Sequence, residues 1–311
     1  MPYSEPAMSA HERPTLVRRL GTMEATTIIV GGVIGSGIFL APALVASNVG
    51  SPIWALAVWA VAGILATAGG LCYAELAAAI PESGGTYQFL KRVYRSPLLA
   101  FLAGWMFFFV DGPGSLAAVA TAFASYAGVF LDTGPVGTKV VAATVLMALV
   151  AVNVLGVQTG GWVQNVVTAL KVLALLAIVV LPLASGQGSW SHFAATGSEP
   201  AGSRLAAVGA AIIPASFAYS GWTFTSYIGA EFRNPGKVIP RGIVLGMAAV
   251  IVIYLAVNVA FQYVLPFDRL AASTVVASDA VLDGPRSLVR KQARNRVYAQ
   301  EAVLLRALAS A

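Results

Sequence analysis

Seven long apolar runs constrain the fold of this chain more than any other feature of its sequence. Each reaches or nearly reaches the roughly 20 residues that a helix needs to cross the hydrocarbon of a bilayer, and the third is long enough to tilt. The runs lie at 25–46, 52–80, 98–131, 140–157, 162–183, 205–228 and 242–264. The sequence therefore predicts an all-α integral membrane protein.

The scarcity of charged residues excludes the common soluble classes. Only 10% of the residues are charged and 58% are apolar, whereas soluble domains carry about 25% charged residues. So few polar side chains cannot cover a water-facing surface, so soluble enzymes and nucleic-acid binders are excluded. The one cysteine, Cys72, has no internal disulfide partner, and we expect it to be a buried small apolar residue.

The basic residues divide the chain and orient it. We expect a polar cytoplasmic leader at 1–24, a transmembrane domain at 25–264, and a loop with a basic tail at 265–311. Nine basic residues lie in the leader and in the loops after the second and sixth runs, against two in the opposing loops. Loops rich in Lys and Arg stay inside, which predicts a cytoplasmic N-terminus. A tail with six basic residues would then lie outside, against the same rule.

The first run has a second interpretation, because Arg18 and Arg19 precede it as in a secretory signal. Glu24 interrupts the approach, the apolar stretch is too long for a signal core, and six further runs follow. We therefore predict a transmembrane helix here.

Four ionisable residues lie inside or at the edges of the runs: Glu75, Asp111, Lys171 and Glu231. Each is costly in lipid and is expected to face other helices or water. Lys171 lies too deep to extend to the membrane surface, which favours a fixed cation or a titrating group lining a pathway. Packing against a helix-end carbonyl is the alternative. Glu75 fits an interfacial position equally well, and Asp111 precedes Gly-Pro-Gly, which favours a helix break.

Two runs contain segments that interrupt a helix. The first holds GGVIGSGIF at 31–39, and the sixth holds SFAYSGWTF at 216–224. Broken helices at membrane depth are tolerated only where they face protein or a cavity. Their free N–H groups suit an anion and their free carbonyls suit a cation, so the pair predicts a zwitterionic ligand. For 31–39 a small-residue packing face at Gly31 and Gly35 is the alternative.

Catalytic patterns are missing from the runs. Both histidines, His11 and His192, lie outside them, so neither a Ser/His pair nor a His-ligated metal is expected at Ser36 or Ser220. We expect no enzyme activity, no catalytic residue, no metal and no cofactor.

Five segments resemble one transporter family. They are GGVIGSGIF at 31–39, LCYAELAAAIPESGGTYQFL at 71–90, PGS at 113–115, TALKVLAL at 168–175 and FAYSGWTFTSYIGAEFRNPGKVIPR at 217–241. In this order and spacing they resemble the amino acid, polyamine and organocation permeases. Within that superfamily, the L-type amino acid transporter branch is the most similar.

The resemblance implies two inverted repeats of five helices, with helices one and six broken at mid-membrane. Backbone N–H groups of the first break would bind a substrate carboxylate, carbonyls of the sixth would bind the α-ammonium, and an aromatic residue would form a wall or gate. The residues so assigned are Gly35, Ser36, Gly37, Phe217, Ala218, Tyr219 and Trp222.

The resemblance also implies a coupling mode. Lys171 would occupy the place where sodium-coupled relatives bind sodium, which implies sodium-independent exchange or proton-linked uptake. Glu231 would serve in gating at the cytoplasmic end of helix six, and 81–85 would form a re-entrant cytoplasmic loop. Glu75 is a further candidate for coupling or gating.

We therefore expect a plasma-membrane permease that moves a neutral amino acid by alternating access. It would bind the amino acid and lie in the bilayer, and it would bind no nucleic acid. Assembly into a homo-oligomer is compatible with the sequence. The family has ten core helices, whereas this chain supplies seven, and family-like sequence stops near Asp283. We expect a frameshifted or shortened end, with an amphipathic tail as the alternative. A non-transporting remnant and, more weakly, a membrane-embedded enzyme are the competing functions.

Overall fold

The computed structural model describes residues 20–94, 96–131, 134–154, 157–186, 188–194, 203–273, 276–277 and 280. Among these residues the regular structure is helical and holds no strand; the one β-type pairing is an isolated bridge between Leu20 and Phe232. The predicted all-α class is thereby confirmed. Leader residues 1–19 and most of the tail expected at 265–311 lie outside the described residues.

The first membrane span is broken inside its glycine-rich segment. Helix α1 covers Thr22–Val33 and α2 covers Gly37–Val49, with a bend of 57° between them. Ile34 ends α1 in an extended conformation, so the helical hydrogen bonds stop there. Two helix ends therefore meet within one span.

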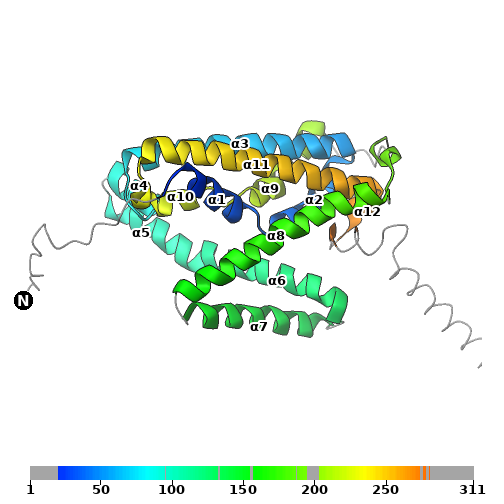
Figure 1. Cartoon of the computed structure of the whole chain (residues 1–311), viewed down its shortest axis with the longest axis horizontal. Helices are drawn as coiled ribbons and strands as arrows, with labels where there is room; N and C mark the ends of the chain where they lie inside the picture. The colour runs from blue at the N-terminus through cyan, green and yellow to red at the C-terminus, as the bar shows by residue number, and fades with distance from the viewer. Residues whose placement is uncertain are drawn as a thin grey trace, which may run out of the picture.

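Two long helices run side by side through the centre of the molecule. These are α3 at Pro52–Ala79 and α11 at Pro235–Val264, and α1 packs along α11 (Figure 1). The close packing of α1 on α11 requires glycine at position 246. Any other residue would place a Cβ 2.6 Å from the side chain of Ile29. In the most apolar window of α11, 44% of the residues are buried, the highest share among the described long spans. Helix α11 is therefore the central support of the bundle.

The sixth span is broken like the first. Helix α9 covers Arg204–Ala218 and packs on α2 and α3, and α10 resumes at Phe224–Tyr227 before a 3-10 turn at Gly229–Glu231. This break explains why the apolar run at 205–228 does not form one long helix. By length and composition, four described helices can cross a membrane, or five if α1 with α2 is one span, while α7 and α9 contribute shorter apolar helices.

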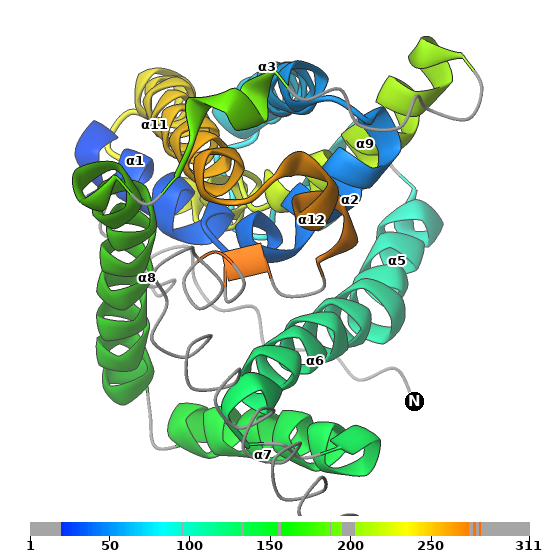
Figure 2. The same ribbon diagram turned by 90° about the vertical axis from the view of Figure 1, so that its right-hand side faces the viewer.

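The middle of the chain forms an arm that stands apart from this bundle. Figures 1 and 2 both show α1, α2, α3, α9 and α11 gathered on one side, with α6 and α7 on the other. Helix α8 returns from the arm to pack on α11. The arm consists of α5 Pro97–Met106, a π-helical turn Phe107–Asp111, α6 Gly112–Leu131 and α7 Gly134–Val154. Helix α4 Thr86–Tyr94 leads into it from the bundle, and α8 Val157–Ser185 leads back.

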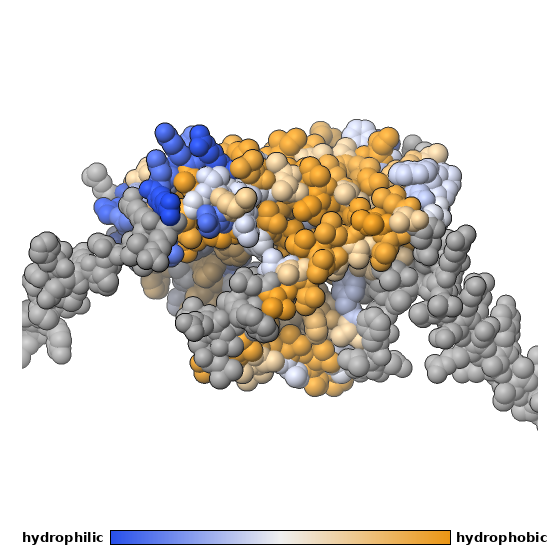
Figure 3. Space-filling model, viewed as in Figure 1, coloured by the Kyte–Doolittle hydropathy of each residue, from blue (hydrophilic) through white to orange (hydrophobic). Residues whose placement is uncertain are grey.

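Surface polarity follows the expected membrane geometry. Apolar residues cover most of the side in Figure 3, and hydrophilic residues gather at the end where α11 begins with Lys237 and Arg241. Two short helices complete the described structure, a 3-10 turn at Trp190–Phe193 and α12 at Phe267–Ala272.

Cys72 is exposed on α3, so the expectation of burial was wrong. Within a bilayer an apolar side chain is as well accommodated by lipid as by a protein core.

A matched pair of glycine substitutions tests the close packing of the two broken spans. A Cβ at Gly37 would lie 2.5 Å from the Cα of Ala218, whereas a Cβ at Gly209 would meet nothing within 4 Å. We expect Gly37→Ala to destabilise the protein by about 1–3 kcal/mol through overpacking. Gly209→Ala, inside α9, should be neutral or stabilising. Thermal unfolding of the purified variants in detergent measures both, and equal midpoints would contradict this packing.

Candidate functional site

The two breaks lie directly against each other. Gly221 has a φ of 119°, and a Cβ there would lie 2.5 Å from the carbonyl oxygen of Gly32. Gly37, at the start of α2, is equally close to Ala218, at the end of α9. Glycine at these positions allows backbone to approach backbone, so the free ends of both broken helices share one small region.

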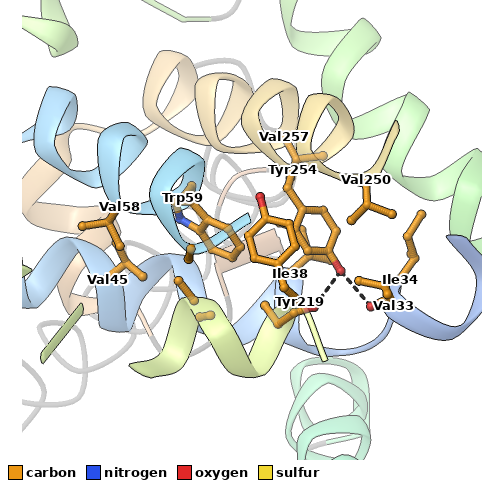
Figure 4. Close-up of a cluster of buried hydrophobic side chains, with 14 of the residues drawn as sticks. Val33, Ile34, Ile38, Val45, Val58, Trp59, Tyr219, Val250, Tyr254 and Val257 are labelled. Atoms are coloured by element: carbon orange, nitrogen blue, oxygen red, sulfur yellow. Dashed lines mark hydrogen bonds between the residues drawn. The ribbon is translucent and has the colours of Figure 1, made fainter. Parts of the chain in front are cut away.

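A tyrosine that the sequence analysis did not single out joins the two breaks. The hydroxyl of Tyr254, on α11, lies 2.9 Å from the carbonyl oxygen of Val33 and 3.1 Å from that of Ala218 (Figure 4). These carbonyls belong to the last residues of α1 and α9. One hydroxyl has one proton to donate, so the two helix ends share a single donor. A tyrosine in the middle of an apolar span was a usable signal, because a buried phenol needs a partner.

Lys171 lies at the first break. Its ammonium donates a hydrogen bond of 3.3 Å to the carbonyl of Ile34, the residue that ends α1, and its side chain is half-buried. This is the helix-end contact that the packing interpretation required. It also puts a positive charge beside the break, as the pathway interpretation required. The contact alone is compatible with both.

The N-terminus of α2 has the character of an anion site. Its first N–H groups have no intrahelical acceptor, and the helix dipole adds positive potential there. Ser36 is the N-cap but makes no side-chain cap bond. A Cβ at Gly35 would meet only the Val33 carbonyl, at 3.8 Å, so this stretch of backbone is accessible. The N–H groups of Gly35, Ser36 and Gly37 therefore lie together at this break, with open space beside Gly35, whereas Gly37 is buried against the Cα of Ala218.

The carbonyls assigned to the substrate ammonium are not equivalent. The Phe217 oxygen already accepts from the Ser220 N–H at 3.1 Å and the Ser220 hydroxyl at 2.7 Å, so both its lone pairs are used. Within the described part of the chain the Ala218 oxygen accepts from Tyr254 alone, which leaves one lone pair. A cation would therefore find its acceptors at Ala218 and Tyr219.

The aromatic side chains near the sixth break point in different directions. Phe217 is half exposed, whereas Tyr219 is fully buried between Trp59 and Tyr254, with ring centroids 5.8 and 5.0 Å away. Trp222 packs edge-to-face on Tyr73 of α3 at 5.2 Å and lies beside Gly69 and Gly70 of the same helix. Figure 4 shows Tyr219 and Trp59 within the core between α3 and α11.

The end of the sixth span is tied to the start of the first. Leu20 donates its N–H to the Glu231 carbonyl at 3.1 Å, and Arg233 donates to the Leu20 carbonyl at 3.1 Å. Gly84, within the expected re-entrant loop, donates to the Tyr227 carbonyl at 3.1 Å. The structure therefore brings Glu231 and 81–85 to the same end of the bundle. Glu75 is exposed on α3 and makes no polar contact within the described residues.

Comparison with known proteins agrees with this geometry. A family model described as amino acid permease matches residues 20–282. The chain belongs to the amino acid permease family. The match ends next to the expected limit of family-like sequence at Asp283, and the predicted resemblance to amino acid permeases of the L-type branch is confirmed.

Three relatives illustrate the relationship. The b(0,+)-type amino acid transporter 1 of Mus musculus is 35% identical over 85% of this chain and 55% of its own length. The serine/threonine exchanger SteT of Bacillus subtilis is 33% identical over 82% of this chain and 57% of its own. The large neutral amino acids transporter small subunit 2 of Mus musculus is 36% identical over 84% and 50%. The chain thus spans about half the length of the curated relatives it matches.

Two neighbouring tyrosines test which hydroxyl holds the site together. The Tyr254 hydroxyl has two carbonyls within hydrogen-bonding distance, whereas the buried Tyr219 hydroxyl has no partner in the described structure. We expect Tyr254→Phe to destabilise the protein by about 1–3 kcal/mol, because two buried carbonyls lose their donor. Tyr219→Phe should change stability by less than about 0.5 kcal/mol or increase it. Unfolding in detergent measures both; an equal loss in the two variants would contradict the assignment.

Proposed function

We propose that this chain forms the substrate-binding part of a secondary amino acid permease that works by alternating access. The observation that carries the proposal is the meeting of the α2 N-terminus with the C-terminal end of α9. One end attracts anions and the other attracts cations, and an α-amino acid carries both charges on one carbon. The names of the relatives, which are transporters and an exchanger of amino acids, support the same activity.

The substrate is held by backbone groups in this proposal. Its carboxylate accepts hydrogen bonds from the N–H groups of 35–37, and its ammonium donates to the carbonyls of Ala218 and Tyr219. Phe217 then contributes packing, since its carbonyl is already used. Ser220, Thr223 and the aromatic Trp222 surround the break without a charge, which supports a neutral side chain.

Coupling depends on Lys171. Its ammonium lies 3.3 Å from the Ile34 carbonyl, one of the free carbonyls that a metal cation would otherwise use. Two unit charges about 4 Å apart repel by about 4 kcal/mol at an effective dielectric of 20. Sodium is therefore excluded, and the activity is sodium-independent exchange or proton-linked uptake. Glu231 and Glu75 are assigned to gating, Glu231 through its backbone link to Leu20.

The chain is a multi-pass membrane protein, and we place it in the plasma membrane with a cytoplasmic N-terminus. This orientation rests on the basic residues Lys91 and Arg92 at the end of α4 and Lys237 and Arg241 at the start of α11. The large apolar side chains of the arm are exposed, Phe108 to 70% and Met147 to 67%. Further helices or lipid cover them in the working transporter.

Reconstitution tests the proposed activity. We expect the 311-residue chain alone to give no exchange of labelled serine, leucine or phenylalanine in liposomes, because alternating access needs a second repeat to move against. A version extended with the second half of the Bacillus subtilis exchanger should give saturable, stereoselective exchange. Exchange by the short chain would contradict this and require a homo-oligomer. Transport of cationic amino acids alone would contradict the neutral substrate.

A sodium substitution tests the coupling. The extended protein should take up a neutral amino acid equally well when sodium is replaced by choline at constant pH, because the Lys171 ammonium occupies the carbonyl of Ile34. A steep rise of uptake with sodium would show that the assignment of Lys171 is wrong.

A further inference from the structure

One face of α11 is exposed from the start of the helix to its middle. The opposite face packs on α1 and α3 and buries Gly242, Ile243, Gly246 and Met247. With 3.6 residues in each turn, the exposed residues fall within an arc of about 100° and form a single stripe along the helix. This outer stripe consists of Lys237, Arg241, Val244, Leu245, Ala248 and Val252.

The outer stripe changes from charged to apolar along the helix. Lys237 and Arg241 stand about one turn apart at its start, and every residue of the stripe after Arg241 is apolar. From Arg241 to Val252 the helix rises about 16 Å, which is close to one leaflet, or half of the roughly 30 Å of hydrocarbon in a bilayer. Figure 3 shows hydrophilic residues gathered at this end of the molecule beside an apolar surface. The two cations therefore lie at the polar edge of the hydrocarbon.

A hollow of about 310 Å³ lies on the stripe at the point where the charge ends. It is lined by Pro240, Arg241, Val244 and Leu245, one charged residue and three apolar ones. A guanidinium group binds the oxygens of a phosphate in pairs, and the Lys237 ammonium one turn away offers three more donors. A ligand that fits this surface carries a phosphate group joined to hydrocarbon.

The protein neutralises neither cation within the part of the chain that the structure describes. The ion pair found there joins Arg92 to Glu82, whereas Lys237 and Arg241 have no carboxylate within ion-pair distance. A zwitterionic lipid brings its own ammonium close to its phosphate, which adds positive charge beside these two cations. An anionic phospholipid brings negative charge alone, so charge complementarity favours the anionic class.

We propose that the outer stripe binds an anionic phospholipid, with the phosphate on Lys237 and Arg241 and an acyl chain in the hollow and along the stripe to Val252. Basic pockets beside transmembrane helices bind anionic head groups in this way. Because the lipid binds the folded chain, it also stabilises α11, the helix that holds Tyr254 against the two breaks. The inference goes beyond the proposed transport activity and does not depend on it.

Competition between two lipids tests the proposal. Phosphatidylglycerol and phosphatidylcholine with the same acyl chains are added at equal concentration to the purified full chain in neutral detergent, and native mass spectrometry measures the two complexes. We expect the phosphatidylglycerol complex to exceed the other roughly thirtyfold, as two basic residues near an anionic surface predict. Phosphatidylglycerol should also raise the thermal unfolding midpoint. Glycerol 3-phosphate, an anion without acyl chains, should do neither and should not compete.

Two double variants with the same net charge locate the site. Lys237→Gln with Arg241→Gln should bring the two lipid complexes to similar amounts. Lys91→Gln with Lys139→Gln removes two exposed charges from α4 and α7 and should keep the wild-type ratio. The exchange of the two cations, Lys237→Arg with Arg241→Lys, should also keep the preference, because both charges remain on the stripe.

Several results would overturn the site. An equal loss of preference in the two glutamine double variants would show general attraction to a basic protein. Equal binding of both lipids by the wild type, or competition by glycerol 3-phosphate, would also contradict it. If the Lys237 and Arg241 double variant does not fold, Arg241→Gln alone decides: a lower ratio supports the site and an unchanged ratio overturns it. None of these measurements requires transport, so the proposed function is tested separately.

Discussion

A backbone polar group inside a membrane must find a partner, and this requirement governs the whole site. Breaking two helices at mid-depth releases carbonyls at Val33, Ile34 and Ala218, each costly to leave unpaired. The Tyr254 hydroxyl shares its one proton between Val33 and Ala218, and the Lys171 ammonium donates to Ile34. Within the described residues, the first N–H groups of α2, one lone pair of the Ala218 carbonyl and the Tyr219 carbonyl are then left for a ligand. The interactions that stabilise the breaks thereby leave free groups of opposite polarity for a ligand.

The packing of the bundle follows from the same constraint. The broken spans can share donors only if their backbones touch, and glycine at 32, 37 and 221 removes the side chains that would keep them apart. Helix α11 carries Tyr254 and is the most buried of the described long spans, so it holds this donor in a fixed position. The arm from α5 to α7 is far more exposed, as expected for helices that contact lipid or further helices.

The breaks and the depth of Lys171 were predictable because glycine content and position within a run are local properties of the sequence. The family motifs further assigned Gly35 to Gly37 and the carbonyls of 217–219. The carbonyl of Phe217 is occupied because Ser220 turns back on it, and Trp222 packs on α3 beside two glycines. The first is a local turn between residues three apart, whose geometry the sequence motif does not specify, and the second depends on a contact between distant segments. The role of Tyr254 was also missed because it depends on distant segments: its two partner residues are 221 and 36 positions away in the chain.

The most direct test of this account is an experimental structure of the chain, or of its extended form, with a neutral amino acid bound. The account predicts the substrate carboxylate within hydrogen-bonding distance of the backbone N–H groups of Gly35, Ser36 and Gly37. It also predicts the ammonium on the carbonyls of Ala218 and Tyr219, with the Tyr254 hydroxyl still joining Val33 to Ala218. A carboxylate bound to the Lys171 ammonium, or a ligand away from both breaks, would contradict it.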